Sequence, residues 1–187
     1  TIVTPRWLEN LQTALYSEPK VGAVSCITSN CSNWQQIDVK YENYEELIDF
    51  ADKMNHSNPE LWEVRPKLVG FCYLIKNEAY KIAGFLDEIY SPGNYEDNDY
   101  SLKLIMAGYK LLVCRDTFIH HYGNESFGKH ATQEEFDKKN NKYKALLQRN
   151  QALFLKKWQI TENYDERHNV IFDVDVPRDT IMRIFVI

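Results

Sequence analysis

The residues of this chain best suited to chemistry form a short acidic stretch, Asn94-Tyr95-Glu96-Asp97-Asn98-Asp99-Tyr100. It lies between a turn-forming string at 90–93 and an apolar pattern of helical spacing that ends at Gly108. With Asn94 as the N-cap, Asp97 is the third residue of that helix, where the partial positive charge of the helix start favours an ionised carboxylate. Such a carboxylate can accept a proton from a hydroxyl group or help to hold a cation. Acidic residues also gather in first turns only to cap helices, and these residues alone favour that structural explanation.

Two adjacent histidines, His120 and His121, follow an apolar strand pattern and form a second candidate group. Successive side chains of a strand point to opposite faces, so only one of the two can enter a site if the strand continues through them. Imidazole is a good ligand for a transition-metal cation such as Mn²⁺. The His-x-Gly spacing favours His121 as the ligand, and a histidine that only hydrogen-bonds at a strand end is the alternative for each.

Alternating helix and strand patterns predict an α/β fold that would position these groups. We expect a first helix that starts after Thr4, with Pro5 at its first position, and carries an apolar stripe to Leu15. Further helices are predicted over 44–54 and 77–83, and a long one from a capping box at 132–135 to about Lys157. Strands are predicted at Val21–Ile27, Leu68–Ile75, Lys110–Cys114 and 170–176.

Two long polar loops, 28–40 and 123–131, exceed what a simple connection needs. Loops of this kind often bind ligands, and Asn30 is the candidate for substrate binding in the first of them. Near the end of the chain, Asp173-Val174-Asp175 places two carboxylates on one strand face, which could hold a cation, but a solvated strand face is the favoured interpretation. The segment 180–187 either pairs with that strand or begins a following domain.

Composition indicates a globular chain and excludes several classes. Its 187 residues are 44% hydrophobic and 13% aromatic, which excludes disorder, and the net charge of -5 argues against nucleic-acid binding. The sequence shows neither an apolar run of membrane-spanning length nor a signal-peptide pattern. The four cysteines, Cys26, Cys31, Cys72 and Cys114, contain no CxxC pair and are interpreted as buried free thiols, which suits a reducing cytoplasm.

Five motifs in one order carry a resemblance to a known family. They are Gly-Phe-Cys-x-Leu-Ile at 70–75, Gly-Phe-Leu-Asp-Glu at 84–88, Gly-Asn-Tyr-Glu-Asp-x-Asp-Tyr at 93–100, Ala-Gly-Tyr-Lys-Leu at 107–111 and Phe-Ile-His-His-Tyr-Gly at 118–123. In this order, and with the stretches at 1–8 and 21–30, they resemble the second half of bacterial family-two nucleotide-sugar glycosyltransferases. The resemblance implies a partial GT-A fold, a mixed sheet with flanking helices and a long C-terminal helix.

The resemblance also implies roles for individual residues in an inverting transfer of a hexosyl or deoxyhexosyl group. Asp97 would be the general base that deprotonates the acceptor hydroxyl, and Glu96 the neighbouring acid that binds acceptor hydroxyls or orients the loop. Gly70 and Phe71 would lie at the donor sugar. His121, with His120 as the second candidate, would help to hold Mg²⁺ or Mn²⁺. Asp99 is a further candidate for substrate binding, although its position favours internal hydrogen bonds.

By this resemblance, residues 1–130 form the acceptor-side half of the transferase domain, 131–160 a helix packed on it, and 161–187 a strand-rich extension or the start of another domain. The family's Asp-x-Asp metal motif would precede Thr1, so we expect the 187-residue chain alone to bind nucleotide sugars weakly and to show no turnover. An uncovered sheet would favour a homo-oligomer.

The implied partners are a nucleotide-sugar donor and a glycan or glycolipid acceptor of polysaccharide biosynthesis, with no nucleic acid. The implied place is the cytoplasm, with peripheral contact to the inner face of the cell membrane through the acceptor as an open alternative. A non-catalytic carbohydrate-binding module and an assembly domain also stay open. A glycoside hydrolase fits less well, because adjacent residues such as Glu96 and Asp97 poorly supply carboxylates on opposite sides of a sugar.

Overall fold

A four-stranded mixed sheet forms the centre of the chain. The computed structural model describes residues 1–31, 33–123, 133–164 and 170–174. The strands follow the order β2-β4-β1-β3, with β1 (Val21–Ile27) and β4 (Lys110–Phe118) parallel in the middle. The short edge strands β2 (Trp62–Val64) and β3 (Leu74–Ile75) are antiparallel to their neighbours. The predicted α/β class is confirmed, as are the strand at Val21–Ile27 and the strand that begins at Lys110.

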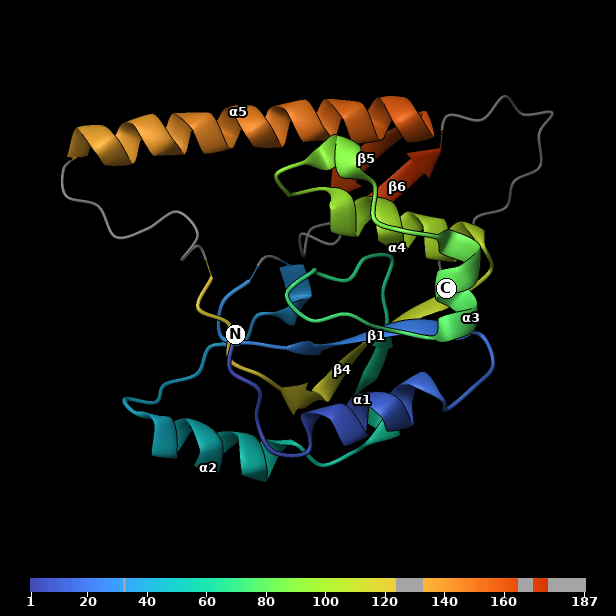
Figure 1. Cartoon of the computed structure of the whole chain (residues 1–187). Coiled ribbons are helices and arrows are strands. Elements are labelled where there is room, and N and C mark those ends of the chain that lie inside the picture. Colours follow the sequence, from blue (N-terminus) through green and yellow to red (C-terminus); the bar gives the residue numbers. More distant parts are fainter. Residues whose placement is uncertain (32, 124–132, 165–169, 175–187) are drawn as a thin grey trace.

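Helices lie on both sides of the sheet (Figure 1). Alternating residues of the two central strands belong to two core clusters, one on each face. Helix α1 (Trp7–Leu15) packs with Val24, Leu112 and other residues of one face, whereas α3 (Asn77–Ala83) and α4 (Glu96–Met106) pack with those of the other face. Leu47 and Ala51 of α2 (Tyr44–Met54) belong to this second cluster. Three short 3-10 helices complete this part of the chain: η1 (Asn33–Gln35), η2 (Pro59–Leu61) and η3 (Glu88–Tyr90).

The predicted strand at Leu68–Ile75 is wrong over most of its length, because only Leu74 and Ile75 pair in the sheet. The backbone N–H groups before them donate to side chains instead. Leu68 donates to Ser101 Oγ at 3.1 Å, Val69 to Gln35 Oε1 at 2.8 Å and Gly70 to Asp97 Oδ2 at 3.1 Å. These three side chains satisfy donors that a strand would have used for a ladder, so the segment lies near the sheet without joining it.

Two helices start later than the sequence predicted. Helix α1 begins at Trp7 rather than Pro5, since Arg6 has a left-handed φ of 57°. Before α4 the cap is Tyr95 with a φ of 75°, not Asn94, so Asp97 is the second helical residue rather than the third. The Asn94 side chain accepts a hydrogen bond from Tyr143 at 3.3 Å and does not cap the helix. Helices 44–54 and 77–83 were predicted correctly.

The long helix α5 (Gln133–Trp158) lies over α4 and is followed by a hairpin of β5 (Ile160–Tyr164) and β6 (Val170–Val174) (Figure 1). The helix was predicted, although Thr132 of its capping box lies outside the described residues. The strand predicted at 170–176 is present over 170–174, where β5 pairs with it and Asp173 faces Thr161. Asp175 and the segment 180–187 also fall outside the described part.

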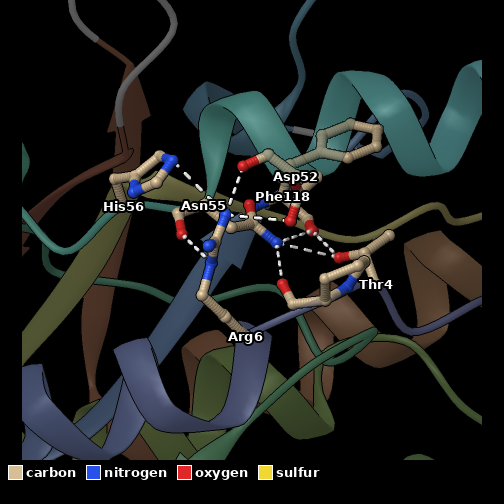
Figure 2. A network of polar contacts seen from close by, with 7 residues as sticks. Thr4, Arg6, Asp52, Asn55, His56 and Phe118 are labelled. Carbon is tan, nitrogen blue, oxygen red and sulfur yellow. Dashed lines mark hydrogen bonds and ion pairs between the residues drawn. The ribbon is translucent and has the colours of Figure 1, made fainter.

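A buried asparagine, Asn55, joins the start of the chain to the end of β4 (Figure 2). Its Nδ2 donates to Thr4 Oγ1 at 3.0 Å, to the Pro5 carbonyl at 2.7 Å and to the Phe118 carbonyl at 3.2 Å. Its Oδ1 accepts from the Phe118 N–H at 2.7 Å, and its own carbonyl accepts from Arg6 Nε at 3.0 Å. We call these residues the Asn55 cluster. One side chain thus holds two distant segments at the end of α2.

Replacing Asn55 with alanine should lower the free energy of unfolding by about 3 kcal/mol, because the Phe118 N–H and several buried carbonyls would lose their partner. Denaturant titration measures this change. The matched control is Asn43→Ala at the other end of α2, where an exposed N-cap bond to the Glu46 N–H at 2.9 Å is lost and about 1 kcal/mol is expected. Equal losses in the two variants would contradict a special role for the Asn55 cluster.

Candidate functional site

The acidic start of α4 contacts the irregular segment before β3. The Gly70 N–H donates to Asp97 Oδ2 at 3.1 Å, and the Asn98 N–H donates to Asp97 Oδ1 at 2.8 Å. A Cβ added at Gly70 would lie 3.5 Å from Asp97 Cβ, so the glycine faces the carboxylate directly. Each carboxylate oxygen has two lone pairs, so both retain capacity to accept a further hydrogen bond. Asp97 is half-buried and oriented by backbone groups, as a positioned proton acceptor must be.

The turn before α4 is fixed by α5. Asn150, fully buried, donates from Nδ2 to the carbonyls of Tyr90, Gly93 and Asn94 at 2.8, 2.9 and 2.8 Å. Arg149 adds a hydrogen bond to the Ser91 carbonyl at 2.5 Å. These donors hold the left-handed turn that leads into α4. The long helix therefore contributes to the position of Asp97.

Phe71, the next residue along the segment, packs against His121. The two rings are 5.4 Å apart between centroids with an interplanar angle of 31°. His121 Nδ1 lies 2.7 Å from the Asn30 carbonyl, which can only accept, so Nδ1 carries a proton and, in the neutral ring, the lone pair is on Nε2. Histidines that ligate metals usually donate their other ring N–H to such a carbonyl. His121 therefore has the tautomer that a metal ligand or a proton acceptor needs.

His120 is engaged within the protein. Its Nδ1 contacts Ser29 Oγ at 3.0 Å and the Tyr41 hydroxyl, and its ring lies edge-on to Tyr122 at 4.3 Å between centroids. Burial lowers the pKa of His120, with a smaller contribution from neighbouring positive charge, so the neutral ring is favoured. The strand ends at Phe118, and the His120 backbone then bonds with Ile2. These contacts favour the strand-end role that the sequence left open for His120.

Asn30 joins the loop 28–40 to the residues that follow β4. Besides accepting from His121, it donates from Nδ2 to the Tyr122 carbonyl at 3.1 Å. A Cβ at Gly123 would lie 2.2 Å from Asn30 Nδ2, and the φ of Gly123 is +69°, so this glycine makes the close approach possible. The candidate substrate ligand Asn30 thus lies at the site, where it positions His121.

Asp99 lies elsewhere, between α4 and α5. It is fully buried and accepts from Trp158 Nε1 at 2.8 Å and from the Tyr90 hydroxyl at 3.2 Å. Lys157 lies 2.7 Å from Oδ1, and Lys103 lies 3.3 Å from Oδ2. The structure places this carboxylate in the packing of α5, in agreement with the internal hydrogen bonds that its position in the sequence favoured. It does not lie with the other candidate substrate ligands.

Glu96 turns inward beside Asp97. Its Oε2 is buried and has no hydrogen-bond partner among the residues that the structure describes. Burial raises the pKa of Glu96, and the charge of Asp97 adds to this effect. Glu96 therefore differs from Asp97 in its surroundings, because its Oε2 is buried without a partner in the described part whereas both oxygens of Asp97 accept backbone hydrogen bonds.

The six residues Asn30, Gly70, Phe71, Glu96, Asp97 and His121 thus form one continuous set of contacts, which we call the candidate site. Sequence reasoning missed Gln35, whose side chain joins the segment before β3 to strand β1. This fully buried side chain donates to Ser25 Oγ at 2.6 Å and to the Cys26 carbonyl at 2.8 Å, and accepts from the Val69 N–H. In the sequence, Gln35 lies in a run of polar residues, and no pattern in that run distinguishes a buried glutamine from an exposed one.

A complete metal centre is not present in the part of the chain described. Over residues 1–31, 33–123, 133–164 and 170–174, no three His, Cys, Asp or Glu side chains gather as a metal site would require. Helices in the same ranges all lack the combination of length and apolar character needed to cross a membrane. Comparisons with protein-family models, with curated proteins and with solved structures find no match to this chain.

The raised pKa of Glu96 predicts a pH-dependent stability difference. A carboxyl whose pKa is raised on folding stabilises the fold below its ordinary value of 4.5 and loses that contribution as pH rises through the higher folded value. The variant Glu96→Gln, which stays neutral, should therefore be more stable than the wild type at pH 7. The difference should shrink as pH falls to about 4. Denaturant titrations at both pH values measure the difference in the free energy of unfolding. A Glu96→Gln variant that is less stable than the wild type at pH 7 would contradict a Glu96 whose charged form is destabilised by burial.

Proposed function

We propose that this chain carries the acceptor side of the active site of an inverting nucleotide-sugar glycosyltransferase with a GT-A fold. The observation that carries the proposal is the run of contacts from Asp97 through Gly70 and Phe71 to His121. These residues come from three motifs that are far apart in the sequence, and the contacts between them support the single site that the resemblance implies. The mixed α/β sheet with flanking helices is compatible with this fold.

In the proposed reaction, Asp97 accepts the proton of the acceptor hydroxyl while the oxygen attacks the anomeric carbon of the donor sugar from the side opposite the leaving nucleotide diphosphate. The Gly70 N–H on Oδ2 keeps the carboxylate in one orientation, which lowers the cost of reaching the reactive geometry. Glu96, the neighbouring acid, binds a second acceptor hydroxyl or orients the loop. The acceptor would be a glycan or a glycolipid.

Mg²⁺ or Mn²⁺ fits this proposal at one position. His121 offers the lone pair of Nε2 and has its Nδ1–H on the Asn30 carbonyl, which is the arrangement of a metal ligand. The other ligands would come from the Asp-x-Asp motif that the resemblance places before Thr1. When bound, the cation would offset the negative charge that grows on the departing diphosphate.

The base role of Asp97 is tested in a protein that carries both this chain and the donor-binding half. Asp97→Asn keeps the shape and removes the proton acceptor, so kcat should fall by a factor on the order of 10²–10⁴ with little change in donor affinity. Steady-state kinetics give both values, and Asp49→Asn on the exposed side of α2 is the matched control. A near-normal kcat in Asp97→Asn would remove Asp97 from the base role and assign it to Glu96.

The metal role of His121 predicts a different kinetic effect. His121→Ala should raise the cation concentration needed for half-maximal rate, because one ligand is lost. Titrating Mn²⁺ at saturating donor and acceptor measures the shift, and the exposed His56→Ala provides the control. An unchanged cation requirement combined with lower thermal stability would mean that His121 only supports Asn30 and Phe71.

A non-catalytic carbohydrate-binding or assembly domain is the second candidate. It is favoured by one observation, that both oxygens of Asp97 already accept backbone hydrogen bonds. Such a domain would bind glycans without a nucleotide or a cation. Calorimetric titration of the chain with oligosaccharides, in the presence and absence of Mn²⁺, separates the two candidates.

A further inference from the structure

Two of the four cysteines lie side by side in the sheet, and a third, Cys72, lies in the segment that leads into β3. Cys26 of β1 is opposite Cys114 of β4 in the parallel register. On the other side of β1, the antiparallel pairing sets Val24 opposite Leu74. Cys72 lies two residues before Leu74, just outside this ladder, and Cys26 lies two residues after Val24. Cys72 and Leu74 pack in the same core cluster as Cys26, on the face of the sheet that α1 covers.

The pair formed by Cys26 and Cys72 combines a reactive thiol with a protected one. Cys26 is fully buried, whereas Cys72 is half-buried next to the edge strand β3. A hydrogen bond from the Cys26 thiol lowers the pKa of Cys72, while burial raises the pKa of Cys26. The hydrogen bond between the two thiols and their shared core cluster bring the sulfur atoms close together, as a disulfide requires.

The other two cysteines are less suited to oxidation. Burial raises the pKa of the Cys114 thiol, which is buried in the centre of the sheet, and raises that of Cys31 to about 12. A thiol that stays protonated is a poor nucleophile, so neither is suited to make the first attack on an oxidant. Cys26 also has a raised pKa, but its hydrogen bond to Cys72 holds it in place for a second, intramolecular attack. The four cysteines therefore differ in reactivity, although the sequence suggested that all are buried free thiols.

We propose that Cys26 and Cys72 are a redox modification site that forms a reversible disulfide with a low-molecular-weight disulfide as oxidant. The Cys72 thiolate attacks one sulfur of the oxidant, which forms a mixed disulfide and releases one thiolate. Cys26 then attacks the Cys72 sulfur, expels the second thiolate and gives up its proton to it. Two protein thiols are oxidised, and the small disulfide is reduced to two thiols.

The position of Cys72 gives this disulfide a structural consequence. Cys72 directly follows Gly70 and Phe71, which contact Asp97 and His121. These residues belong to the segment that pairs with no strand, so a covalent link to β1 would restrain it. The inference concerns the thiols alone and holds whether or not the chain acts on sugars.

The test uses the reduced full chain, incubated at neutral pH with mixtures of reduced and oxidised glutathione. Free thiols are then alkylated, and peptides are mapped by mass spectrometry. We expect one cross-linked pair containing Cys26 and Cys72, the loss of two hydrogen atoms in the intact mass, and alkylated Cys31 and Cys114 after denaturation. Addition of excess reduced glutathione should reverse the cross-link.

Variants separate the role of Cys72, which attacks the oxidant, from that of Cys26, which attacks the mixed disulfide. Cys72→Ser should lose the cross-link, Cys26→Ser should keep glutathione bound to Cys72 as a mixed disulfide, and the control Cys31→Ser should form the cross-link as the wild type does. Circular dichroism establishes that each variant is folded. The proposal is overturned if the wild type gives only mixed disulfides, no oxidation, or a cross-link that contains Cys31 or Cys114, and this mapping of the wild type decides even if a variant unfolds.

Discussion

The hydrogen bonds of the buried Asn55 side chain are the constraint on which the candidate site depends most. This amide bonds to both backbone groups of Phe118, where β4 ends, and to Thr4 and Pro5 at the start of the chain. His120 and His121 follow after one residue, Ile119, so Asn55 holds the chain immediately before them. Buried polar groups that are fully paired give rigidity, since any displacement leaves a desolvated donor or acceptor without a partner.

On the opposite side of the candidate site, side chains accept the backbone hydrogen bonds that a neighbouring strand would otherwise accept. Ser101, Gln35 and Asp97 accept from three consecutive backbone N–H groups at 68–70. The acid proposed to be the base is therefore also a structural partner of the segment proposed to face the donor. A site built in this way couples the orientation of its carboxylate to the position of the neighbouring backbone.

Hydrophobic periodicity predicted the elements with strong patterns, such as Val21–Ile27 and the helix at 44–54, because burial on one face leaves a regular signal. It failed at Leu68–Ile75, since an apolar run looks the same whether its backbone bonds to a strand or to side chains. It also missed β5, whose sequence Ile-Thr-Glu-Asn-Tyr has little apolar content and depends on its partner β6. At the site, the motifs indicated Asp97, Gly70 and His121, whereas the contacts of His120 with Ser29 and Tyr41 join residues too far apart for any pattern to reveal.

Asp99 restricts how α5 can sit on the rest of the chain. Its buried carboxylate needs Lys157 and Trp158, and the carbonyls of the preceding turn need Asn150, all from that one helix. Sliding α5 by one turn would remove Lys157 and Trp158 from this buried carboxylate and leave it with Lys103 and the Tyr90 hydroxyl alone, which is destabilising because a buried charge loses part of its compensation. A wholly apolar contact would tolerate such slippage far better. These polar contacts therefore fix the position of α5 along α4. Because the β5–β6 hairpin follows α5 directly, they also fix where the hairpin starts.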